Sequence, residues 1–297
     1  MFVAAGSGDG EALYRIGPDG VARVVRVLNQ PDSGAPFEVH DATLSGGPSP
    51  TTCLLWSAQH DRRVLCYPFG QSKGVQVAAA DPAVDDHPNE IGAIGLSQDG
   101  SRFAWVDIAV KDDSEVLRTG KLSPSGLSSA TALPVSSTEC ANYVVSVGWQ
   151  DSGTLFLECN GENDAAGGYS LQPLHGKGRM LDERHVSPYN EFPGRASVRG
   201  GFAIGLEGEY CEITCDDGKP ATVLRGVRWD VSTGRVVDVA VVPGKGRYVR
   251  DIWGGHDGVV YVTESTAFKE RRIYVRLPGM RVGVRVTGIS YVDGAEP

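Results

Sequence analysis

Short apolar runs alternate with clusters of glycine, aspartate, serine and proline along the whole chain. The runs are rich in Val, Ile, Tyr, Phe and Trp, which favour β-strands, and the clusters between them are typical of turns. Convincing amphipathic helical periodicity is hard to find in any segment. The pattern therefore predicts an all-β protein built from many short antiparallel strands.

The strands and turns repeat as a unit of two hairpins, which is the sequence signature of a repeat architecture. The first hairpin is an apolar stretch, a glycine-containing turn and a second apolar stretch, and it occurs at 40–58, 91–107, 145–159, 196–208 and 251–264. The second is a strand, a Pro/Ser/Gly turn and another strand, and it occurs at 11–27, 62–79, 115–133, 169–183, 226–242 and 271–286. We therefore expect a six-bladed β-propeller with four antiparallel strands per blade.

The two ends of the chain are complementary parts of one such unit. Residues 2–6 form a second strand without a preceding first strand, and residues 288–297 resemble a first strand without a second. Pairing them removes a free sheet edge. We therefore expect a single domain, residues 1–297, whose C-terminal strand closes the first blade. An open β-sandwich is the alternative, but it leaves the complementary ends unexplained.

Two stretches resemble repeats of known propellers. GLSQDGSRFAW (95–105) resembles the unit of TolB-type propellers, the PD40 or WD40-like repeat, and VRWDVSTGR (227–235) resembles the Trp-Asp segment of WD40 blades. The Gly-His dipeptide of WD40 repeats is missing from the expected places. The resemblance thus implies an architecture and leaves the activity open.

The composition restricts the kinds of partner that the protein can bind and the cellular compartments in which it can be located. The 297 residues carry a net charge of −9, so a nucleic-acid-binding surface is not expected. No apolar run approaches the length of about 18 residues that a membrane span needs, and no signal peptide is visible at the start. We expect a cytoplasmic protein if Met1 is native, and a secreted or periplasmic one with its leader removed as the alternative.

The six cysteines allow two interpretations. Cys53 and Cys66 flank a hairpin that would place them opposite each other, where a cross-strand disulfide is geometrically reasonable. Cys211 and Cys215 could bridge only if the chain turns between them. Buried free thiols in a cytosolic protein are the alternative. Because no paired CxxC or HxxxH spacing exists, a zinc site is not expected.

Polar residues precede the first strand of most predicted blades. In a propeller these strands line the central channel, and the segments leading into them share one concave mouth. The candidate site residues are His40, Asp41, His87, Glu90, Asn142, Tyr143, Glu191, Arg195, Arg250 and Asp251. The segment before the last of these strands, residues 286–288, contains no ionisable side chain. Seven arginines between 247 and 285 predict a basic face on the last blade.

These residue types support several functions. A small-molecule ligand at the mouth is the leading hypothesis, with lactone or ester hydrolysis or cyclisation as its catalytic forms. In these reactions His40 and His87 would transfer protons. Asp41 and Glu90 would orient the two imidazole rings or balance their positive charge. Arg250 would stabilise an anion. No organic cofactor is expected.

Three alternatives stay open. The acids and asparagines around the axis resemble the single calcium site of the gluconolactonase and paraoxonase group, although no motif of that group is reproduced; the resemblance implies calcium with a histidine base. The polar groups could instead satisfy one another and trapped water. The third alternative is a non-catalytic, TolB-like scaffold that binds a protein partner through its acidic loops or its basic last blade.

Overall fold

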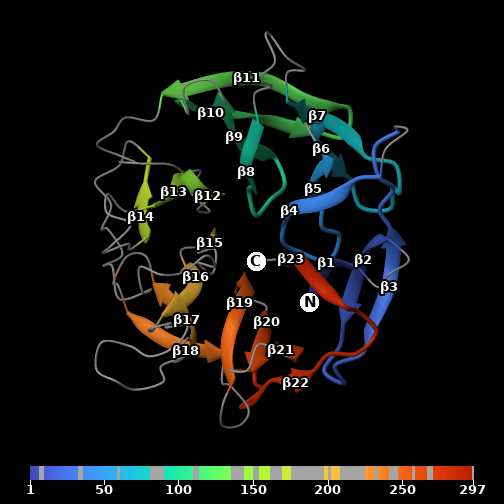
Figure 1. Cartoon of the computed structure of the whole chain (residues 1–297), viewed down its shortest axis with the longest axis vertical. Coiled ribbons are helices and arrows are strands. Elements are labelled where there is room, and N and C mark those ends of the chain that lie inside the picture. Colours follow the sequence, from blue (N-terminus) through green and yellow to red (C-terminus); the bar gives the residue numbers. More distant parts are fainter. Residues whose placement is uncertain are drawn as a thin grey trace.

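The chain folds into β-sheets that surround a common centre (Figure 1). The computed structural model describes residues 1–6, 10–32, 36–58, 61–80, 90–109, 114–134, 144–149, 154–160, 169–174, 197–199, 202–207, 225–230, 233, 235–240, 247–255, 258–265 and 270–295. Within these residues every regular element is a strand, which confirms the all-β prediction. No helix in this part of the chain is long and apolar enough to cross a membrane.

One sheet joins the two ends of the chain. Its spatial order is β23–β1–β2–β3, formed by β1 (Phe2–Gly6), β2 (Glu11–Ile16), β3 (Ala22–Val27) and β23 (Tyr291–Ala295). Strand β23 runs antiparallel to β1, with Ala295 opposite Val3 and Tyr291 opposite Gly6. The predicted pairing of the chain ends is therefore present, and β23 is the strand of this sheet closest to the centre (Figure 1).

Three further sheets are four-stranded antiparallel meanders in chain order. The second comprises β4 (Glu38–Leu44), β5 (Thr52–Ala58), β6 (Asp61–Tyr67) and β7 (Val75–Ala79). The third comprises β8 (Glu90–Leu96), β9 (Arg102–Ala109), β10 (Ser114–Ser123) and β11 (Gly126–Pro134). The last comprises β19 (Arg247–Gly255), β20 (Gly258–Ser265), β21 (Arg271–Arg276) and β22 (Val284–Arg285).

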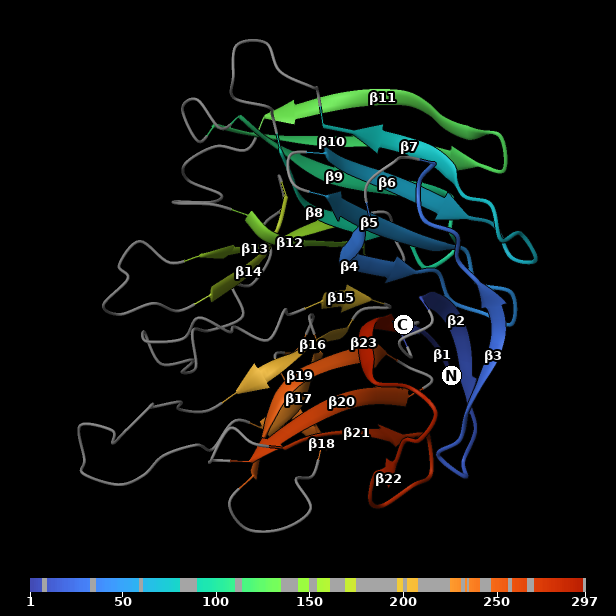
Figure 2. The same cartoon turned by 45° about the vertical axis from the view of Figure 1, so that its right-hand side comes forward.

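The remaining sheet has seven strands and contains two successive meanders. A single parallel pair, Trp149 opposite Arg199, joins them. The strands are β12 (Val144–Trp149), β13 (Leu155–Asn160), β14 (Tyr169–Pro173), β15 (Ser197–Arg199), β16 (Phe202–Glu207), β17 (Arg225–Asp230) and β18 (Val236–Ala240). Sheets that radiate from a centre in this way form a β-propeller. Figure 2 shows β8–β11 and β19–β22 on opposite sides of that centre.

The core lies between neighbouring sheets. Leu13 of β2 packs in one cluster with Leu54 of β5, and Val3 of β1 packs in another with Val260 of β20. All four side chains are inaccessible to solvent. Because each sheet buries both faces against its neighbours, the innermost strands are held firmly and can position side chains at the centre.

The hairpin of β5 and β6 carries a disulfide. Cys53 lies opposite Cys66, their Cα atoms are 4.0 Å apart, and the two sulfurs are bonded. The cross-strand register that the sequence suggested for this pair is confirmed. Cys211 and Cys215 lie outside the described residues.

Candidate functional site

Among the described residues, the innermost strands β4, β8, β12, β19 and β23 each carry a β-bulge or register shift close to their first residues. Three of these bulges concern the site. The ladder of β4 against β5 shifts between Val39 and Asp41, so His40 is the extra residue. The ladder of β19 against β20 shifts in the same way around Arg250. In β23 the residue passed over is Asp293, since Ala4 faces Gly294 and Ala5 faces Val292. A bulge redirects a side chain out of the regular alternation.

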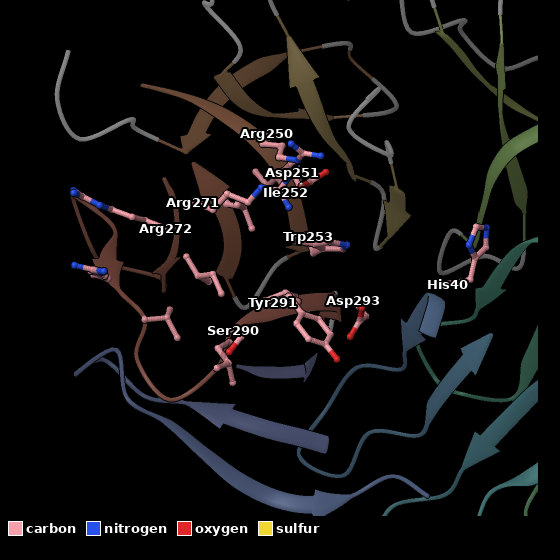
Figure 3. Close-up of a pocket in the computed structure, with 16 residues that line it drawn as sticks. His40, Arg250, Asp251, Ile252, Trp253, Arg271, Arg272, Ser290, Tyr291 and Asp293 are labelled. Atoms are coloured by element: carbon pink, nitrogen blue, oxygen red, sulfur yellow. Dashed lines mark ion pairs between the residues drawn. The ribbon is translucent and has the colours of Figure 1, made fainter. Parts of the chain in front are cut away.

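The three bulge residues line one cavity of about 600 Å³. It lies between the last sheet, β19–β22, and strand β23. Charged side chains dominate its polar wall, and they are Arg250, Arg271, Arg272, Arg285, Asp251 and Asp293. Figure 3 shows Arg250, Asp251 and Arg271 close together, Tyr291 and Asp293 on another side, and His40 across the cavity from them. Arginines outnumber carboxylates four to two among the residues that line this space, and we call it the basic cavity.

A buried carboxylate fixes two of these arginines. The side chain of Glu264 is 4% exposed, and it accepts hydrogen bonds from Arg250 Nη1 at 2.7 Å, Tyr248 Oη at 2.9 Å and Arg271 Nε at 3.2 Å. Burial by itself raises the pKa of Glu264, but the donors outweigh burial and hold the pKa below its ordinary value. Glu264 is therefore ionised at neutral pH and holds Arg250 in place.

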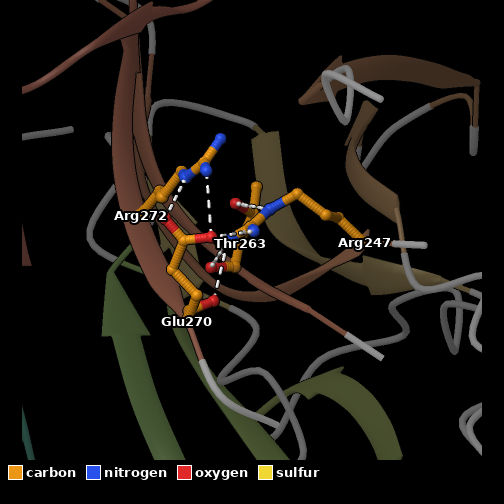
Figure 4. Close-up of polar contacts among 4 residues, drawn as sticks. All are labelled: Arg247, Thr263, Glu270 and Arg272. Carbon is orange, nitrogen blue, oxygen red and sulfur yellow. Dashed lines mark hydrogen bonds and ion pairs between the residues drawn. The ribbon is translucent and has the colours of Figure 1, made fainter. Parts of the chain in front are cut away.

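A second ionic cluster fixes the hairpin that carries Arg271 and Arg272 (Figure 4). Arg247 donates to Thr263 Oγ1 and to the Thr263 carbonyl, both at 3.2 Å, and to the Glu270 carbonyl at 2.8 Å. The Glu270 carboxylate in turn pairs with Arg272 at 2.7 Å. The side chain of Arg247 is only 8% exposed, whereas that of Glu270 is 48% exposed, so these contacts join the end of β20 to the start of β21 at the edge of the solvent.

Arg285 differs from the other arginines of the cavity. It lies on the short strand β22, is exposed, and forms no ion pair with any residue in the described part of the chain. Its positive charge is thus not balanced by a neighbouring acid.

Half of the predicted site residues fall within the described part of the chain. His40, Arg250 and Asp251 line the cavity together. Asp41 and Glu90 do not line it. The predicted residues His87, Asn142, Tyr143, Glu191 and Arg195 lie outside the described residues.

Asp41 and Glu90 make contacts within the scaffold. The Asp41 carboxylate accepts hydrogen bonds from the backbone amides of Ala42 at 2.8 Å and Ile94 at 3.4 Å, and so connects β4 to β8. Glu90 pairs with Arg62 at 2.9 Å. Both residues thereby connect the second sheet to the third.

Sequence reasoning missed Tyr291 and Asp293. The sequence pattern places the segment leading into the last innermost strand at residues 286–288, which carry no candidate side chain, but the strand begins only at Tyr291. Each of these three bulge residues follows a valine, and this shared pattern could have identified Asp293 from the sequence. The three segments are Val39-His40-Asp41, Val249-Arg250-Asp251 and Val292-Asp293-Gly294. Arg271, Arg272 and Arg285 were noticed only as part of a basic face.

In the described ranges, no three His, Cys, Asp or Glu side chains come together in an arrangement that could hold a metal ion.

Comparisons with known proteins show the fold of this chain and give no information about its activity. No family model and no curated protein sequence matches the chain. Among solved structures, a variant of the Synechocystis apocarotenoid oxygenase superposes with a TM-score of 0.52 at 9% identity, over 99% of this chain and 73% of the other. The periplasmic gluconolactonase of Pseudomonas aeruginosa gives 0.49 at 14% identity, over 99% of this chain and 96% of the other.

A prolyl endopeptidase gives a TM-score of 0.48 at 12% identity over 98% of this chain, which spans 40% of the length of that enzyme. At such identities a likeness shows a shared fold and carries no activity with it. Function must therefore be argued from the cavity itself.

Proposed function

We propose that this chain is a single-domain, six-bladed β-propeller that binds a small anionic molecule in the basic cavity between β19–β22 and β23. Four of the blades are the four-stranded sheets, and the two meanders of the seven-stranded sheet supply the other two. The short match of residues 95–105 to the TolB-type repeat supports this count as a resemblance.

The observation that carries the proposal is the excess of arginine in a cavity of ligand size. A volume of about 600 Å³ suits a small molecule. Guanidinium groups bind carboxylate and phosphate oxygens through paired hydrogen bonds. Arg250 is held by Glu264, and Arg285 keeps an unbalanced charge, so the cavity offers a fixed anchor and a free one.

The test is a calorimetric titration with citrate as the anionic probe. Arg285→Gln is expected to weaken citrate binding at least fivefold, because it removes the free cation, and added salt weakens binding further. The matched control is Arg281→Gln, which removes an exposed arginine four residues away that does not line the cavity. Absent binding by the wild type, or equal losses in both variants, would overturn the proposal.

A catalytic form of the same proposal is lactone or ester hydrolysis. It is favoured by the position of His40, an exposed imidazole that lines the same cavity as Arg250. In this form His40 takes the proton from a water that attacks the substrate carbonyl, and Arg250, across the cavity, binds the anionic end of the substrate. His40→Gln then removes turnover of a lactone substrate and leaves citrate binding intact. The scaffold hypothesis stays a prediction, because its acidic loops lie mostly outside the described residues.

The disulfide provides information about the cellular compartment of the protein. Bonds of this kind persist where thiols are not kept reduced. Cys53–Cys66 therefore supports the secreted or periplasmic alternative over a cytoplasmic location.

A further inference from the structure

A second cavity, of about 650 Å³, lies on the other side of Tyr291 and Asp293. Residues of β2, β4 and β23 surround it, together with the segment after β3. Only Tyr291 and Asp293 line both cavities, so these two side chains form the wall between them. The character of this second space is opposite to that of the basic cavity.

Three carboxyl groups line the second cavity, and no lysine, arginine or histidine does. They belong to Glu11, Glu38 and Asp293. All three act on the same phenol: burial raises the pKa of Tyr291 first, and the adjacent Glu11, Asp293 and Glu38 raise it further. The three negative charges therefore converge on one place.

Glu11 is the least exposed of these acids. It is 5% exposed, and its Oε1 accepts a hydrogen bond from Tyr291 Oη at 2.5 Å. Its Oε2 is enclosed and has no hydrogen-bond partner in the protein. A carboxylate that is buried and half-satisfied is destabilising unless a positive charge lies nearby. Arg26, opposite Leu13 on β3, is also buried, and its Nε and Nη2 likewise have no hydrogen-bond partner in the protein.

The rest of the wall is apolar and aromatic. Phe37 and Trp56 line the cavity beside Tyr291, and both are more than nine-tenths buried in the core between the first and second sheets. Aromatic faces attract organic cations, as the Arg63 guanidinium 5.7 Å from the centre of the Phe37 ring shows here, and the carboxylates supply the opposite charge. The acids do not form a preorganised metal site, since no metal-holding group of side chains occurs in the described ranges.

We propose that this second cavity binds an organic cation, an ammonium or guanidinium group attached to an apolar body. The charge of Glu11, Glu38 and Asp293 attracts the cation, and Phe37, Trp56 and Tyr291 enclose the apolar part. The site does not depend on the basic cavity, and the two are separable because Glu11 and Glu38 line only this one.

The experiment compares benzylammonium with benzyl alcohol, its neutral counterpart, by ligand-observed NMR titration of the full chain. Benzylammonium is expected to bind at least tenfold more tightly than benzyl alcohol. Glu11→Gln keeps the acceptor for Tyr291 and removes the charge, so it should weaken benzylammonium binding at least fivefold and leave benzyl alcohol unchanged. Glu38→Gln, at an exposed position, should weaken benzylammonium binding two- to threefold.

The control variant is Asp19→Asn, which removes one negative charge from an exposed pair with Arg23 away from either cavity. It should bind benzylammonium as the wild type does, and citrate titrations should be unchanged in both cavity variants. Equal affinity for benzylammonium and benzyl alcohol overturns the proposal. So does an unchanged affinity in Glu11→Gln and Glu38→Gln, the result expected if the buried Arg26 neutralises Glu11 instead and Glu38 contributes nothing.

Discussion

At the scale of single residues, Glu264 determines how the charges of the basic cavity are arranged. Its carboxylate accepts hydrogen bonds from Arg250, Arg271 and Tyr248, and it is almost fully buried. Replacing it by Gln leaves Arg250 without its main partner. We expect Glu264→Gln to lower the free energy of unfolding by about 2 kcal/mol at pH 7, the range for hydrogen bonds to charged groups. Urea denaturation measures this difference.

The same prediction has a pH dependence with a defined sign. The folded-state pKa of Glu264 lies below its ordinary value of 4.5, so its contribution is fully present above that value. It is lost as the pH falls through the folded-state pKa. The stability difference between wild type and Glu264→Gln should therefore shrink in acid. Glu270→Gln, at an exposed carboxylate, serves as the control and should cost less at pH 7. A difference that grows in acid would contradict this account.

At the residue level, the sequence singled out His40, Arg250 and Asp251, which the structure places around one cavity, but it did not single out Tyr291 and Asp293. The first three follow directly from their place at the start of an innermost strand. The other two depend on where β23 begins and on which of its residues forms the bulge. Bulge position is set by packing against the neighbouring strand. A pattern of alternating residues therefore does not reveal it.

At the scale of elements, the β5–β6 hairpin was predictable down to its register. Two cysteines at the same distance from the turn specify which residues face each other, and the structure pairs them so. The bonded pair closes a loop over a sequence separation of 13 residues. Restricting a loop of that size in the unfolded chain is worth about 3 kcal/mol.

We therefore expect the double variant Cys53→Ala, Cys66→Ala to be less stable than the oxidised wild type by about 3 kcal/mol in urea denaturation. Reductant should lower the stability of the wild type towards that of the variant. The variant itself, as its own control, should not respond to reductant. Wild-type stability that is the same with and without reductant would contradict the bonded state.

At the scale of the whole molecule, the pairing of β23 with β1 joins the two ends of the chain in one sheet. The sequence predicted this pairing because each end carries part of a unit that recurs elsewhere in full. The cavities were not predictable in the same way, since they form where side chains of two sheets fail to meet. Their walls combine residues as distant as Glu11 and Tyr291. Only the folded ring brings such residues together.

Closure by β23 makes a final prediction about stability. Deleting residues 288–297 removes Val292 and Ala295 from the core cluster that they share with Val3, and leaves β1 as an open edge. We expect the melting temperature of the deletion variant to fall by about 10 °C or more. A synthetic peptide of residues 288–297 should restore it by adding the missing strand, since an open edge accepts a matching strand. A scrambled peptide of the same composition is the control. An unchanged melting temperature after the deletion would show that the ring does not depend on this strand.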